Sequence, residues 1–153
     1  MDSFDTDVLI YPAVLEHGLG RRIGTLFITE ADKRSDTAIS VGSVLLVPEL
    51  RSKPLHDHEE EELGALGASL GRLDLLPTDK STAELATALG SAYDFRSADA
   101  SHLATAVGAG ADRLITNNRA DFPKSITEID VTYPDDLSEP LEWPTSLVRK
   151  RRR

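Results

Sequence analysis

Residues 99–122 read DASHLATAVGAGADRLITNNRADF, and this stretch combines a helix, a glycine turn and a strand in immediate succession. The helix is predicted over about 98–109, with Ser97 as its N-cap and Gly108 and Gly110 at its end. The apolar run Arg113–Thr116 then predicts a strand. A strand that directly follows a helix is typical of chains in which the two kinds of element alternate.

The same alternation is found along most of the chain. Further strands are predicted over Phe4–Tyr11, Ala38–Val41, Leu73–Leu76 and Ile129–Tyr133. Further helices are predicted around Glu49, after a proposed N-cap at Asp57, and over 80–94, with Pro48 in the first turn of the helix that holds Glu49. Alternating strands and helices indicate an α/β fold, a three-layer α/β/α sandwich with a central parallel sheet.

Composition places the chain among single-domain globular proteins. Its 153 residues are 40% hydrophobic and 28% charged. The absence of cysteine excludes disulfides, thiolate metal sites and a cysteine nucleophile. We expect one folded domain over residues 1–135 and an extended tail over 136–153. The chain shows no signal-peptide pattern and no membrane-spanning run, so a cytoplasmic protein without a membrane partner is expected.

Charge is strongly acidic and unevenly distributed. The net charge is −9, and because the last five residues (RKRRR) carry +5, residues 1–148 carry −14. Lysine is scarce, with 5 against 12 arginines, and the 15 aspartates exceed the 11 glutamates. This pattern favours a halophilic protein that is stabilised by screening in a salt-rich cytoplasm. The basic tail is either a solvated end or an aid to the capture of a negatively charged substrate.

Four acidic residues are predicted to lie at strand ends or helix starts. They are Asp5, Glu49, Asp99 and Asp121. The carboxyl ends of parallel strands meet in one crevice, so these side chains are expected to converge there. Clustered carboxylates repel one another unless a cation joins them, and such oxygen ligands suit Mg²⁺ or Mn²⁺. Metal-assisted phosphoryl chemistry is therefore the leading functional hypothesis.

Three segments in order resemble the PIN domain, and most closely the VapC-type toxin ribonucleases. They are FDTDVLIY at residues 4–11, SVLLVPEL at 43–50 and the stretch at 99–122. The resemblance implies a magnesium-dependent endoribonuclease with an RNA substrate. It also implies that the chain is the toxin of a type II toxin–antitoxin pair, with a small antitoxin protein as partner and a homodimer as the assembly.

The resemblance also assigns the metal ligands. Asp5, Glu49 and Asp99 match three of the family's metal-binding acids. The fourth position is open between Asn118, where many relatives have an aspartate, and Asp121 of the closing Asp-Phe pair.

Other residues are candidates near the site. His102 is interpreted either as a support for the ligands or as a hydrogen-bonded core histidine. The remaining candidates to line the site or to meet phosphate are Thr6, Asp7, Ser43, Thr116 and Arg96. His56 and His58 are interpreted as part of an exposed loop.

Two alternatives remain open. Asp5-Thr6-Asp7 imitates the Asp-x-Asp motif of haloacid-dehalogenase-type phosphatases, although Leu9 stands where that motif requires Thr or Val. A non-catalytic PIN module that binds RNA or protein is the other alternative, and the uncharged Asn118 favours it.

Overall fold

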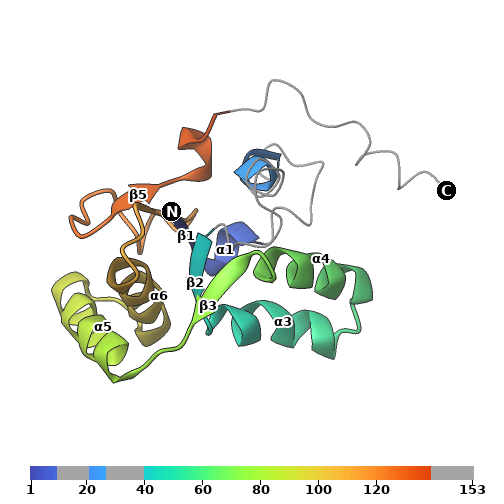
Figure 1. Ribbon diagram of the computed structural model, residues 1–153, viewed down its shortest axis with the longest axis horizontal. Helices are drawn as coiled ribbons and strands as arrows, with labels where there is room; N and C mark the ends of the chain where they lie inside the picture. The colour runs from blue at the N-terminus through green and yellow to red at the C-terminus, as the bar shows by residue number, and fades with distance from the viewer. Residues whose placement is uncertain (10–20, 27–39, 139–153) are drawn as a thin grey trace.

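The computed structural model describes residues 1–9, 21–26 and 40–138, in which a parallel sheet forms the centre of the fold. Its five strands have the order β3-β2-β1-β4-β5 (Figure 1). Their bounds are β1 Asp2–Phe4, β2 Ser40–Ser43, β3 Leu73–Leu76, β4 Arg113–Ile115 and β5 Asp130–Thr132. The first strand of the chain is thus the middle strand of the sheet, between β2 and β4.

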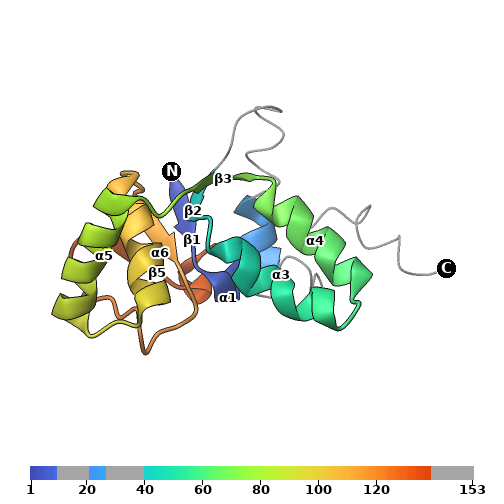
Figure 2. The same ribbon diagram turned by 90° about the horizontal axis from the view of Figure 1, so that it is seen from below.

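Helices cover both faces of this sheet. Their bounds are α1 Thr6–Leu9, α3 Leu46–His56, α4 Glu60–Leu70, α5 Lys80–Tyr93 and α6 Ser97–Gly108. Residues 21–26 are also helical, and Pro134–Asp136 form a 3₁₀ turn. Figures 1 and 2 show α5 and α6 on one side of the sheet and α1, α3 and α4 on the other. The predicted three-layer α/β/α sandwich is therefore confirmed.

Each face of the sheet has its own hydrophobic core. One core joins β1 to α1, α3 and α4 and includes Phe4, Leu46 and Ile115. The other joins α5 and α6 to β4 and β5 and includes Leu114 and Phe122. The neighbouring residues Leu114 and Ile115 thus belong to different cores, because successive side chains of a strand point to opposite faces.

The predicted strand Phe4–Tyr11 is wrong, because β1 ends at Phe4 and the helix α1 begins at Thr6. A short apolar run fits a buried helix as well as a buried strand. Val8 and Leu9 are fully buried on the helix, and the Asp5 carboxylate accepts the Thr6 N–H at the point where the chain changes direction. Ile10 and Tyr11 lie outside the described residues.

Two predicted helix caps are also wrong. Asp57 ends α3 instead of opening α4, and its carboxylate accepts a hydrogen bond from Lys53 Nζ at 2.9 Å. Glu59 takes the N-cap position of α4. Ser97 is the first residue of α6 and Arg96 is its N-cap. The predictions for Leu73–Leu76, for the helix at 80–94 and for Pro48 in a first turn agree with the structure.

The structure describes only the first residues of the predicted C-terminal tail, up to residue 138. Leu137, within the predicted tail, is buried in the core that contains Phe4, while residues 139–153 lie outside the described part of the chain.

The predicted strand over Ala38–Val41 corresponds to β2, although Ala38 and Ile39 lie outside the described residues. Within residues 1–9, 21–26 and 40–138, none of the helices has the length and apolar character that a membrane crossing requires.

Candidate metal centre

The predicted site residues gather at the carboxyl edge of the sheet. Asp5 directly follows β1, and Thr116 directly follows β4. The chain leaves β1 toward β2 on one side, while β4 joins β1 on the other, so the strand order changes direction at this point. In open parallel sheets such a switch point forms the ligand crevice. The fold therefore directs Asp5 into the place where an α/β protein binds its ligand.

Asp5 is buried and held at both carboxylate oxygens. Asp5 is only 4% exposed to solvent. Oδ1 accepts the Thr6 N–H at 2.8 Å, and Oδ2 accepts the Thr116 hydroxyl at 2.9 Å. Burial raises the pKa of Asp5 and the negative charge of Glu49 adds to this rise, while the two hydrogen bonds oppose it. The two hydrogen bonds fix the orientation of the carboxylate and favour its negative charge, which burial alone would disfavour.

Glu49, in the first turn of α3, is held through one oxygen. Its Oε2 accepts a hydrogen bond from the Thr6 hydroxyl and lies 3.0 Å from His102 Nε2. Thr6 begins α1 and His102 belongs to α6, so this single oxygen connects three helices. Glu49 thereby enters the site from a helix that covers the opposite face of the sheet from α6.

Asp99, in the first turn of α6, differs from Asp5 in having no hydrogen-bond donor among the described residues. Partial burial raises its pKa, followed by the negative charges of Asp5 and Asp121. Glu49 acts in the same direction, and His102 opposes it. The other three predicted acids thus all lie close enough to Asp99 for their charges to affect its pKa.

The loop after β4 joins Asn118 to Asp121. Asn118 Nδ2 donates to Asp121 Oδ2 at 2.8 Å, and Asn118 Oδ1 accepts the Asp121 N–H at 3.3 Å. The Asn118 N–H in turn donates to Thr116 Oγ1 at 3.0 Å, next to Asp5. Asn118 therefore holds Asp121, and Asp121 is the member of the pair whose charge reaches Asp99.

Asp7 is a further carboxylate beside the predicted set. Burial, followed by the charge of Asp5, raises the pKa of Asp7 to about 6. Its Oδ1 accepts the Asn117 N–H at 3.2 Å. Asp7 thus ties α1 to the loop that carries Asn118 and Asp121.

The remaining candidates take supporting positions. Ser43 is buried at the end of β2, and its hydroxyl oxygen accepts the Leu45 N–H at 3.2 Å. Arg96 is exposed at the start of α6. His56 and His58 are exposed where α3 ends and α4 begins, as predicted. The contact between His102 and Glu49 was not predicted, because a pairing across 53 residues leaves no local pattern in a sequence.

The donor chemistry fits a hard divalent cation, although the side chains do not form a closed ligand set. In the described part of the chain, no group of three or more His, Asp or Glu side chains stands ready to hold a metal ion. The available donors are carboxylate oxygens, which Mg²⁺ and Mn²⁺ prefer. A cation would also offset the repulsion at Asp99, which lacks any donor from the described residues.

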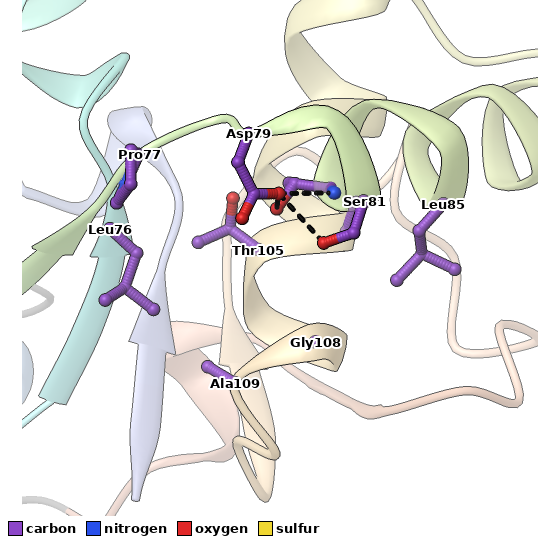
Figure 3. Close-up of a pocket in the computed structure, with 10 residues that line it drawn as sticks. Leu76, Pro77, Asp79, Ser81, Leu85, Thr105, Gly108 and Ala109 are labelled. Atoms are coloured by element: carbon purple, nitrogen blue, oxygen red, sulfur yellow. Dashed lines mark hydrogen bonds between the residues drawn. The ribbon is translucent and has the colours of Figure 1, made fainter.

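A separate hollow of about 390 Å³ lies between the end of β3, the first turns of α5 and the second half of α6 (Figure 3). Its polar groups bond to one another: the Asp79 carboxylate caps α5 and accepts hydrogen bonds from Ser81 and Thr82. None of the four predicted acids lines it. The hollow is thus distinct from the carboxylate cluster.

Two solved structures share the fold. A chain of a toxin–antitoxin complex from Klebsiella pneumoniae aligns with a TM-score of 0.63 and 23% identity, over 88% of this chain and 98% of that one. A chain of VapBC2 from Rickettsia felis, bound to a DNA fragment from its promoter, aligns with a TM-score of 0.63 and 15% identity, over 86% and 97%.

Sequence comparison gives the family. No curated protein sequence matches the chain. Residues 4–124, however, match the PIN domain family. This match extends from β1 to the loop that follows Asp121, so it includes every element that contributes an acid to the cluster. The chain therefore belongs to the PIN domain family.

Proposed function

We propose that this chain is a metal-dependent endoribonuclease that hydrolyses RNA phosphodiester bonds as the toxin of a type II toxin–antitoxin pair. The observation that carries the proposal is the convergence of Asp5, Glu49, Asp99 and Asp121 at the carboxyl edge of the sheet in a PIN domain. The solved structures with the same fold come from toxin–antitoxin complexes, which supports the cellular role.

The proposed cofactor is Mg²⁺, with Mn²⁺ as a substitute. Asp5, Glu49 and Asp99 would hold it, together with Asp121 and with Asn118 as the support of Asp121. A bound divalent ion of this kind makes a water nucleophilic at neutral pH and stabilises charge on the leaving oxygen.

The protein's own contribution is to place acids where a polyanion has to bind. Thr6 and Thr116 fix both oxygens of Asp5, so this carboxylate keeps one orientation. Asp99 contributes negative charge without a hydrogen-bond donor from the described residues. RNA phosphates would be repelled by this cluster in the metal-free protein, so substrate binding and catalysis are both expected to require the cation.

The partners in this proposal are an RNA substrate, a small antitoxin protein that blocks the site, and a second copy of the chain in a homodimer. The antitoxin is supported by the complexes that share the fold. Co-expression of the chain with a small DNA-binding protein encoded beside it would test this part of the proposal.

A nuclease assay on the purified full chain tests the proposed activity. Internal cleavage of RNA is expected in Mg²⁺ or Mn²⁺, and none in EDTA, because the uncompensated carboxylates cannot activate water. Restoring an excess of Mg²⁺ after EDTA should restore cleavage. RNA cleavage that persists undiminished in chelator would contradict the proposal.

A non-catalytic PIN module remains the second candidate, and one observation favours it. The described side chains do not form a ready ligand set, and Asn118, which is joined to Asp121, carries no charge. RNA binding without cleavage in either metal would establish this alternative. The phosphatase alternative loses its support through the PIN domain match.

The fourth ligand position gives a separate prediction. Asp121→Asn is expected to weaken Mg²⁺ binding about tenfold, because it removes a charge that reaches Asp99. Asn118→Ala removes only the hydrogen bonds that hold Asp121, and a loss below about threefold is expected. Isothermal titration of both variants with Mg²⁺ measures the difference. A larger loss in Asn118→Ala would identify Asn118 as the ligand instead.

A further inference from the structure

His102 is almost fully buried, at 2% exposure, yet its side chain makes a single hydrogen bond among the described residues. Its Nε2 lies 3.0 Å from Glu49 Oε2, and its Nδ1 is buried without a partner. A carboxylate oxygen only accepts, so Nε2 carries the proton and donates it to Glu49.

The two oxygens of Glu49 are treated differently by the protein. Oε2 accepts hydrogen bonds from two sides, from the Thr6 hydroxyl on α1 and from His102 on α6. Oε1 accepts none from residues 1–9, 21–26 and 40–138. The Glu49 side chain is 31% exposed, so a ligand can reach it from solvent.

We propose that His102 is a positioning residue, which together with Thr6 anchors Glu49 Oε2 so that Oε1 is presented to the divalent cation. This inference rests on the proposed metal-dependent function. A glutamate has three rotatable side-chain bonds, and ordering them when a cation binds costs conformational entropy. Two donors from different helices fix those bonds in advance, and such support normally strengthens metal binding without contacting the metal.

The position of His102 on α6 adds a second effect. It follows Asp99 by three residues, so both face the same side of the helix. The His102 bond therefore links the helix that carries Asp99 to the helix that carries Glu49. Two acids from opposite faces of the sheet are held in one arrangement through a single imidazole.

Two amide variants separate positioning from packing. A glutamine at 102 places a donor near the position of Nε2, whereas the shorter asparagine does not reach Glu49. We expect His102→Asn to weaken Mn²⁺ binding about 10- to 100-fold in calorimetric titration, and His102→Gln to restore most of that loss. Unfolding temperatures measured in EDTA report the structural cost, which both variants share.

A double substitution shows whether the effect passes through Glu49. In a Glu49→Gln background, His102→Asn should cause little further loss of Mn²⁺ affinity, because its target oxygen no longer takes part. Should both histidine variants prove unfolded, Thr6→Val removes the other donor to Oε2, and weakened Mn²⁺ binding is expected there as well. Equal affinity of His102→Asn, or of Thr6→Val, and the wild-type chain would overturn the positioning role alone. A wild-type chain that binds neither Mg²⁺ nor Mn²⁺ would overturn the proposed function and this inference with it.

Discussion

Replacing Asp99 with asparagine is expected to lower metal-dependent RNA cleavage on the order of 10²- to 10³-fold without destabilising the fold. Asp99 accepts no hydrogen bond from the described residues, and burial and the charges of Asp5 and Asp121 raise its pKa. A raised pKa means that the folded state disfavours the negative form. The metal-free Asp99→Asn variant should therefore unfold at the same temperature as the wild type or at a higher one.

The opposite signs of these two effects make the prediction specific. Cleavage rates in saturating Mg²⁺ and unfolding temperatures in EDTA are measured on the same preparations. Asp74→Asn serves as a matched control, because Asp74 is exposed on β3 and lies apart from the cluster. It should leave cleavage unchanged. Full activity of Asp99→Asn would remove Asp99 from the site, and a marked loss of stability would assign it a structural role instead.

Truncating Phe122 to alanine is expected to reduce the free energy of unfolding by about 3–5 kcal/mol. Its ring is fully buried, 5.3 Å from the Phe95 ring centre, in the core between the sheet and the helices α5 and α6. Its backbone also accepts the Tyr133 hydroxyl at 2.9 Å and donates to the Asn118 carbonyl. The total free energy of unfolding of a domain is about 5–15 kcal/mol, so this substitution would remove a large share of the stability.

Urea unfolding followed by circular dichroism gives the measurement. Leu55→Ala is the control, since Leu55 is 62% exposed and its truncation should change the free energy by less than about 0.5 kcal/mol. Because Phe122 directly follows Asp121, Phe122→Ala should also weaken metal binding. An unfolding free energy for Phe122→Ala within 1 kcal/mol of the wild-type value would contradict the described core.

The sequence predicts the fold well wherever a segment has a clear period and clear boundaries. Leu73–Leu76 is bounded by Pro77, and its strand agrees at both ends. The helix at 80–94 agrees to within one residue, because its apolar spacing is regular and Asp79 caps it. The error at Val8–Leu9 arises where this information is missing: four apolar residues in a row have no period that separates a buried helix from a buried strand.

The site is predicted at the level of residue types and not of contacts. Strand ends and helix starts are local features, so Asp5, Glu49 and Asp99 can be selected from sequence. In the structure they lie close enough that the charges of Asp5 and Glu49 affect the pKa of Asp99. The bonds that hold them come from distant residues, such as Thr116 to Asp5 and His102 to Glu49. Pairings of this kind depend on how layers pack, and a single sequence contains no periodic signal for them.

The central place of β1 in the sheet has a consequence for the order in which the protein is made. Ribosomes synthesise β1 first, yet β1 gains its second neighbour only when Arg113–Ile115 has been added. Until then Asp5 lacks the Thr116 hydroxyl, and Asp121 does not yet exist. For the proposed nuclease, a nascent chain would therefore be harmless to the messenger that encodes it, and activity would begin only with a nearly finished domain.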